Sequence, residues 1–119
     1  MKLSEAEWAV MESLWRCSRR SLAAVSAELK TVKGWSKNTV HTYLTRMEKK
    51  GLVAIDHALS EPYAAAVSRA DCAREERTEL LDKVYGGATG ELIAAFLKDS
   101  TISREEVERL RRLLDEMEV

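Results

Sequence analysis

The chain has 119 residues, of which 45% are hydrophobic and 33% are charged, which is typical of one soluble globular domain with or without a small extension. A net charge of −1 argues against a uniformly basic nucleic-acid-binding protein, and no apolar run reaches the roughly 18 residues of a membrane span. The charge is unevenly distributed, however. Residues 16–50 hold nine basic and two acidic residues, whereas residues 68–119 hold nine basic and thirteen acidic ones.

The sequence indicates neither a secretory signal nor a cysteine framework. Polar and acidic residues follow the N-terminus too closely for a signal-peptide core. Cys17 and Cys72 form no CxxC motif and no Cys/His pair, so we expect no disulfide, metal or other cofactor. We predict a cytoplasmic protein in which both thiols are buried as small hydrophobic groups. The alternative, a redox switch, requires a lowered thiol pKa.

Three helices are predicted in residues 4–50, each opened by a serine N-cap. Ser4 and Glu7 form a capping-box pair, and Ser21 and Ser36 cap the next two helices. The helices end near Cys17, at Lys33–Gly34 and at Lys50 before Gly51. Apolar residues at helical spacing mark the core sides of the first two helices: Trp8, Val10, Met11, Leu14, Trp15, Leu22, Val25 and Leu29.

The periodicity becomes strand-like after the third helix. Residues 52–55 and 63–67 are short β-prone runs, and the turn between them holds Pro62, the only proline of the chain. A β-hairpin after three helices is the element order of a winged helix.

From Ser68 the pattern is helical to the end of the chain. We predict helices over residues 68–85 and 91–98 and after Ser103, with Gly86–Gly87 as a break. The last helix carries an apolar seam at Val107, Leu110, Leu114 and Met117. Because little local surface is left to cover it, we predict that this seam forms a dimer contact together with Leu92 and Phe96.

The third predicted helix has two unlike faces. Its apolar face holds Val40, Tyr43, Leu44 and Met47. The opposite face holds hydrogen-bonding and basic side chains without a carboxylate: Asn38, His41, Thr42, Thr45, Arg46 and Lys49. A helix that is only solvated usually mixes Glu with Lys, whereas a helix beside phosphates has to avoid negative charge. The sequence therefore predicts a DNA-recognition helix, with a solvated polar face as the alternative.

Residue chemistry gives each member of this face a candidate role. Asn can pair with an adenine edge, Thr can contact a thymine methyl group or a phosphate, and Arg and Lys can bind guanine or phosphate. The first turn, made of Lys37, Asn38 and Thr39, is expected to reach phosphates and base edges. Arg46 is predicted to clamp a phosphate, with an ion pair to Glu48 or Glu12 as the alternative.

Other residues near this helix have two interpretations each. His41 either contacts a base or is an exposed residue without a role in binding. Trp35 is expected to pack at the junction of the second and third helices rather than on a base, because bases in a duplex are not open to stacking. Arg16, Arg19 and Arg20 either touch the flanking DNA backbone or form a solvated loop.

The string from Trp35 to Leu52 resembles the recognition-helix signature of the BlaI/MecI/CopY family of bacterial penicillinase repressors. The opening Leu3–Met11 with Leu14–Trp15, the Ser68–Arg69 pair after the hairpin and the three-helix tail are similar to the same family. The resemblance therefore covers nearly the whole chain.

The resemblance implies a dimeric winged-helix repressor on a palindromic operator, often of TACA/TGTA type, with the C-terminal helices making the dimer. In its β-lactam-responsive members, a membrane-bound sensor protease triggers cleavage of the repressor in the dimerisation region. The Asn–Phe bond cleaved there aligns with Ala95–Phe96, where Phe is kept and Asn is not. The cysteine pairs of the copper-responsive members are missing, which disfavours control by copper.

The wing departs from the family pattern, which usually carries a Lys/Arg-Gly-Arg stretch followed by aromatic residues. Residues 57–63 hold neither Lys nor Arg, so only His57 is left for a wing contact to phosphate.

The sequence thus predicts a mainly α fold with a small β-hairpin wing: a winged helix-turn-helix DNA-binding domain over residues 1–67 and a helical dimerisation region over residues 68–119. The predicted function is a dimeric, sequence-specific repressor in an antibiotic response, partnered by double-stranded DNA and a sensor protease system, without membrane insertion. An enzyme is not expected, since the chain lacks a nucleophile motif and has only two histidines. The alternative is a winged-helix protein–protein interaction module without specific DNA binding, favoured by a wing without Lys or Arg and by the acidic C-terminal half.

Overall fold

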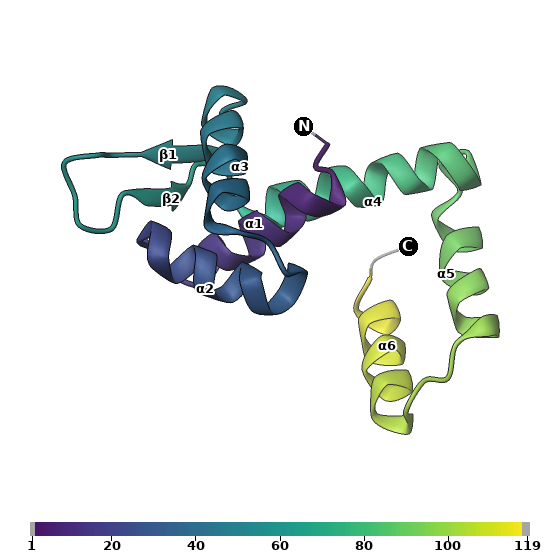
Figure 1. Cartoon of the computed structure of the whole chain (residues 1–119). Coiled ribbons are helices and arrows are strands. Elements are labelled where there is room, and N and C mark those ends of the chain that lie inside the picture. Colours follow the sequence, from purple (N-terminus) through teal and green to yellow (C-terminus); the bar gives the residue numbers. More distant parts are fainter. Residues whose placement is uncertain (1, 118–119) are drawn as a thin grey trace. The chain divides into compact units, whose positions relative to one another are not determined.

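Six helices and one hairpin follow one another in the computed structural model, which describes residues 2–117 (Figure 1). The helices are α1 (Glu5–Trp15), α2 (Leu22–Lys33), α3 (Lys37–Lys49), α4 (Arg69–Tyr85), α5 (Thr89–Asp99) and α6 (Arg104–Glu116). The strands are β1 (Val53–Ile55) and β2 (Tyr63–Ala65), which lie between α3 and α4. The predicted mainly α fold with a small hairpin is confirmed.

The helix starts follow the predicted serine caps. Ser4 Oγ accepts a hydrogen bond from the Glu7 N–H at 3.1 Å, and Glu7 Oε1 accepts one from the Ser4 N–H at 3.0 Å, which completes the capping box. Helices α2, α3, α4 and α6 begin in the same way. The serine Oγ before each helix accepts a hydrogen bond from the backbone N–H three residues further on: Ser21, Ser36, Ser68 and Ser103. Gly51, with a φ of 81°, adopts the left-handed conformation in which the chain leaves α3 for the hairpin.

The core lies between α1, α2, α3 and the hairpin. Its buried helical residues are Val10, Met11, Leu14, Val25, Leu29, Val40, Leu44 and Met47. Leu52, Val53 and Tyr63 continue this core beneath the hairpin. The larger aromatic rings of Trp8 and Trp15 are half-buried at its margin. The hydrophobic periodicity of the sequence therefore predicted the buried sides of the three helices correctly.

The hairpin is antiparallel, with Ile55 opposite Tyr63. Its second strand stops at Ala65, two residues before the predicted end, because Val67 leaves the ladder and its carbonyl accepts a hydrogen bond from the Trp15 indole at 2.9 Å. Arg20, in the α1–α2 connection, exchanges two backbone hydrogen bonds with Tyr63, of 2.8 and 3.0 Å. This connection therefore pairs with the hairpin edge, which the sequence did not predict.

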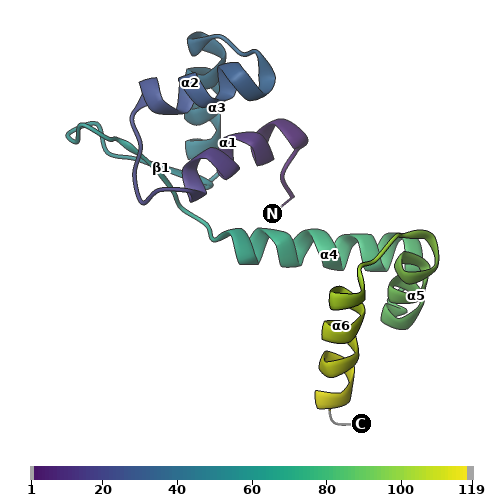
Figure 2. The same ribbon diagram turned by 90° about the horizontal axis from the view of Figure 1, so that it is seen from below.

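Two compact units divide the chain, residues 1–77 and residues 78–119. The division falls within α4, which begins at the domain boundary expected from the sequence. In the second unit, Gly86 and Gly87 have φ angles of 55° and 85° and end α4, as predicted. Helix α5 begins two residues before the predicted start, and the chain then turns through residues 100–103 into α6 (Figure 2). No residue from 78 to 117 is buried.

Candidate nucleic-acid interface

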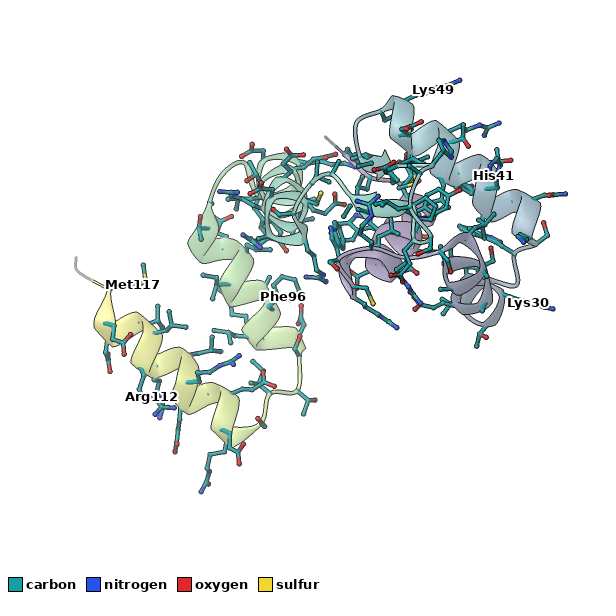
Figure 3. The ribbon with its side chains drawn as sticks, turned by 90° about the vertical axis from the view of Figure 1, so that its left-hand side faces the viewer. Lys30, His41, Lys49, Phe96, Arg112 and Met117 are labelled. Atoms are coloured by element: carbon teal, nitrogen blue, oxygen red, sulfur yellow. The ribbon has the colours of Figure 1, made fainter. Side chains whose placement is uncertain are left out.

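The outer face of α3 is open to solvent along the helix. Asn38, His41, Thr42, Arg46 and Lys49 are exposed, and Thr45 is half-buried. Figure 3 shows His41 and Lys49 on the outer side of α3. Glu48 is the only acidic residue of the helix. The six residues predicted to share this face therefore do so.

The inner face of α3 holds the helix on the core. Val40, Leu44 and Met47 are fully buried. Tyr43 is half-buried, and its ring stacks on Trp35 with the centroids 4.8 Å apart and the planes 12° from parallel. Trp35 thus packs at the junction of α2 and α3, as predicted. Its stacking on Tyr43 holds the segment before α3 against the middle of that helix.

The hydroxyl groups at the start of α3 already have partners. Ser36 Oγ accepts a hydrogen bond from the Thr39 N–H at 3.2 Å and lies 3.1 Å from Thr39 Oγ1. Thr42 Oγ1 donates to the Asn38 carbonyl at 2.9 Å. The Thr42 hydroxyl proton is therefore engaged within the helix, whereas the amide of Asn38 is exposed and open to a base edge.

Several cations of the basic stretch are used inside the protein. Arg16 and Arg20 both pair with Glu28, at 3.3 and 2.9 Å, and Arg20 also donates to the Ser13 hydroxyl at 2.8 Å. Arg19 donates to the backbone carbonyls of residues 61 and 62 in the wing. Neither interpretation offered for these three arginines included a structural role, so the sequence missed it.

Apart from Lys50, the remaining cations of this stretch are all exposed: Lys30, Lys33, Lys37, Arg46 and Lys49. Within residues 2–117 the structure gives none of these five an ion pair, and the alternative pairing of Arg46 with Glu48 or Glu12 is absent. Glu12 pairs with Arg69 instead. The free positive charge is therefore concentrated on the end of α2 and on α3.

Lys50, at the end of α3, is tied to a buried carboxylate. Its Nζ lies 2.8 Å from Glu7 Oε2, and Glu7 is only 6% exposed. Burial alone would raise the pKa of Glu7, but the Lys50 ammonium and the hydrogen bonds from Ser4 outweigh it, so the pKa lies below its ordinary value of 4.5. This pair joins the end of α3 to the first turn of α1.

The tip of the hairpin carries little that could bind phosphate. Its loop holds Asp56 and Glu61, and His57 is exposed. Arg19 Nε, from the α1–α2 connection, donates to the Glu61 carbonyl at 2.9 Å. The base of the wing is fixed by Arg19 and Arg20, while its tip lacks basic residues.

Comparison with known proteins agrees with this arrangement. The family model described as penicillinase repressor matches residues 3–116. The chain belongs to the penicillinase repressor family. It is 30% identical over 116 residues to the methicillin resistance regulatory protein MecI of Staphylococcus aureus strain N315, covering 96% of this chain and 94% of that protein. It is also 29% identical to the penicillinase repressor of Bacillus licheniformis, covering 97% of this chain and 91% of that protein.

Among solved structures, the chain is similar to a MarR/EmrR family transcriptional regulator from Acinetobacter sp. ADP1. The TM-score is 0.42 at 17% identity, and the match covers 97% of this chain and 78% of that one. Membership of the penicillinase repressor family confirms the resemblance read from the sequence and makes this chain a DNA-binding transcriptional repressor. Its three helices followed by a hairpin have the element order of a winged helix.

The C-terminal helices of this repressor expose much of their apolar surface. Phe96 is 58% exposed, Leu114 58% and Met117 61%, while Leu92, Val107 and Leu110 are half-buried. Figure 3 shows Phe96 on α5 and Met117 at the end of α6. The Ala95–Phe96 bond lies inside α5. These side chains are far more exposed than those of the core of residues 1–77.

The two cysteines differ, and the prediction for Cys17 is wrong. Cys72 is buried as predicted, and burial raises the pKa of its thiol. Cys17 is exposed, and it lies beyond the end of α1 at Trp15, in the connection to α2. Within residues 2–117 no three His, Cys, Asp or Glu side chains gather as a metal site. None of the described helices is both long and apolar enough to cross a membrane.

Proposed function

We propose that this repressor acts as a homodimer on a palindromic operator, with α3 of each copy in the major groove of one half-site. The observation that carries the proposal is the exposed outer face of α3, which bears Asn38, His41, Arg46 and Lys49 and no carboxylate. A negative group on that face would repel the phosphates that flank the groove.

The proposed roles follow from position on α3. Asn38 and His41 contact base edges, because their side chains are exposed near the start of the helix. Thr42 offers its methyl group, since its hydroxyl proton is held by the Asn38 carbonyl. The phosphate and supporting contacts come from Lys37, Thr39, Thr45, Arg46 and Lys49. With a wing tip that lacks cations, affinity depends on α3 and on the joining of two copies.

We propose that residues 1–67 form the DNA-binding domain and residues 68–119 the dimerisation region. The proposed dimer contacts are Leu92, Phe96, Val107, Leu110, Leu114 and Met117. The exposure of Phe96, Leu114 and Met117 supports this assignment, because a contiguous exposed apolar surface usually marks an interaction site. A chain that binds DNA in this way acts in the bacterial cytoplasm and performs no catalysis of its own.

We propose further that a membrane-bound sensor protease system relieves repression by cleavage at Ala95–Phe96. The bond lies inside a hydrogen-bonded helix, in which the Phe96 carbonyl accepts from the Ser100 N–H at 3.0 Å, so α5 has to open locally first. Cleavage there would separate α6 from the rest of the dimerisation region and lower affinity, because two linked half-sites bind more tightly than one. Intact protein in derepressed native cells would contradict this route.

The DNA-binding proposal is tested by titrating the full chain with a labelled fragment of its own upstream region, followed by fluorescence anisotropy at several salt concentrations. We expect saturable binding that outcompetes unrelated DNA and weakens steeply with salt. Lys83 is an exposed cation of α4 outside the proposed DNA-binding face. The control variant Lys83→Ala should therefore bind this DNA as the unmodified protein does. A protein that binds no DNA specifically but captures a protein partner would contradict the proposal and favour an interaction module.

A further inference from the structure

An open hollow of about 650 Å³ lies where α2 meets the start of α3. On the α2 side it is lined by Ala23, Ala27 and Lys30, which follow one another at helical spacing. The α2–α3 connection and the first residue of α3 contribute Trp35 and Lys37. None of the described residues that line the hollow is acidic. It therefore combines small apolar side chains with two cations.

Alanine keeps the α2 side of this hollow open. Ala23 and Ala27 are exposed, so another molecule can approach the backbone of α2 closely there. A longer side chain at either position would occupy that space. Trp35 is half-buried, and its stacking on Tyr43 holds the indole ring in place beside the hollow. These apolar surfaces suit a sugar ring rather than a charged group.

Lys30 and Lys37 bring positive charge to the same hollow. Both side chains are exposed, and within residues 2–117 the structure gives neither of them an ion pair. In Figure 3, Lys30 projects on the side of residues 1–77 that also carries His41 and Lys49. The backbone N–H groups at the start of α3 add partial positive charge. Positive charge without a counter-charge in the protein attracts an anion.

We propose that this hollow binds one phosphodiester of the operator backbone, with the phosphate between Lys30 and Lys37 and the adjoining deoxyribose against Ala27 and Trp35. The inference rests on the proposed function, in which α3 lies in the major groove. It extends the DNA interface from α3 to α2 and makes Lys30 a DNA contact, which the sequence did not single out.

Lys30 should contribute affinity rather than sequence preference, because a phosphate looks the same at every base pair. We expect Lys30→Ala to lower the slope of the logarithm of the binding constant against the logarithm of salt concentration by about 0.9 for each copy bound. Between about 50 and 200 mM salt, the affinity then changes about threefold less for each copy. The ranking of single-base operator variants should stay the same.

The test replaces the phosphates of the operator one at a time by neutral methylphosphonate and measures binding of the full chain by fluorescence anisotropy. We expect one position in each half-site at which this replacement weakens the unmodified protein more than it weakens Lys30→Ala. Part of the charge that faces that phosphate is already missing in the variant, so the two losses are not additive. At the other phosphates the two proteins should lose affinity equally.

Lys33→Ala is the matched control. Lys33 is also an exposed lysine in the last turn of α2, but it does not line the hollow. Both substitutions remove one charge near the same helix end, so they alter the net charge and the interaction with the helix dipole alike. We expect Lys33→Ala to keep the sensitivity at the position where Lys30→Ala loses it. Thermal melting checks that each variant remains folded.

A second pair of variants tests the hollow itself. Ala27→Gln and Ala27→Glu place side chains of nearly equal size in it, and both residues are good helix formers. Only the carboxylate repels a phosphate, so we expect Ala27→Glu to bind the operator about tenfold more weakly than Ala27→Gln. Equal affinities of these two variants would show that no phosphate enters the hollow.

The outcomes separate the two proposals. Absence of specific DNA binding by the unmodified protein would overturn the proposed function, and the bound phosphodiester with it. Specific binding in which Lys30→Ala and the unmodified protein respond alike to every methylphosphonate would overturn only the role of the hollow. The same altered pattern in Lys33→Ala as in Lys30→Ala would overturn it as well, because the effect would then reflect overall charge.

Discussion

The two compact units, residues 1–77 and 78–117, differ in how far they bury their apolar side chains. The first unit encloses a core in which Val10, Leu44 and Met47 are fully buried. The second has apolar side chains at helical spacing but buries none of its described residues. An apolar helix face is stable in water only when another surface covers it. The first unit therefore contains its own partner surfaces, while the second is expected to find them on another copy.

The N-terminal and C-terminal parts of the chain also differ in charge. The free cations of residues 16–50 lie on the end of α2 and on α3, whereas residues 68–119 carry an acidic excess. This acidic excess keeps the proposed dimerisation region from competing with the proposed DNA-binding face for phosphate. The net charge of −1 is thus the sum of a basic and an acidic region.

The largest effect on stability should come from the core of the first unit. Leu44→Ala removes a fully buried side chain and leaves a cavity, so we expect a loss of about 2–5 kcal/mol in the free energy of unfolding, independent of protein concentration. Urea denaturation measures it. Val32→Ala, at an exposed apolar residue of α2, should change stability by less than about 0.5 kcal/mol. Equal losses in the two variants would contradict the assigned core.

A substitution on the apolar seam of the second unit should change the dissociation constant of the proposed dimer rather than the stability of the core. Leu114→Glu places a charge on the exposed apolar seam, and we expect the dissociation constant of the dimer to rise about a hundredfold, because the charge would have to be desolvated in the interface. Sedimentation equilibrium over a range of concentrations measures this change. Glu108→Gln, an exposed polar position of the same helix, serves as the control. An unchanged dimer in Leu114→Glu would remove α6 from the interface.

The pair between Glu7 and Lys50 gives a smaller effect that depends on pH. Because the folded-state pKa of Glu7 is lowered, its contribution to stability is fully present above the unfolded value of about 4.5 and is lost as pH falls through the folded value. We expect Glu7→Gln to cost about 1–2 kcal/mol at pH 7 and progressively less below pH 4.5. Denaturation at several pH values measures the difference. Glu5→Gln, exposed on the same helix, serves as the control variant.

The most localised changes concern single DNA contacts on α3. Arg46→Ala should weaken binding to all sequences by about 1 kcal/mol and reduce the salt slope by about one, as expected for one phosphate contact. Asn38→Ala should relax the preference at one base position by about 1–3 kcal/mol. Competition titrations with single-base operator variants distinguish the two patterns. The same uniform loss in Asn38→Ala would exclude a base contact by Asn38.

The features predicted well from the sequence are local. The bond between Ser4 and Glu7 spans three residues, and the two faces of α3 follow from a repeat of 3.6 residues, so both can be read without knowing the fold. The resemblance to the penicillinase repressors rested on short continuous segments, above all Trp35–Leu52, and was confirmed.

The features that were missed depend on residues far apart in the sequence. Arg19 reaches the Glu61 carbonyl across 42 residues, and Lys50 reaches Glu7 across 43. No local pattern marks such partners, so cations that are fixed inside the protein were counted with those free to bind DNA. Cys17 was assigned to the core for a related reason, because its exposure depends on where α1 ends and how the next connection turns.

The central claim is that residues 1–67 bind DNA while residues 68–119 join two copies. The most direct measurement is the mass of the complex between the full chain and its operator, determined by sedimentation velocity for the unmodified protein and for Leu114→Glu. We expect two copies on one palindrome for the unmodified protein, and at the same concentration largely unbound DNA for Leu114→Glu. A single copy bound per palindrome, with equal affinity in the two proteins, would contradict this division of tasks.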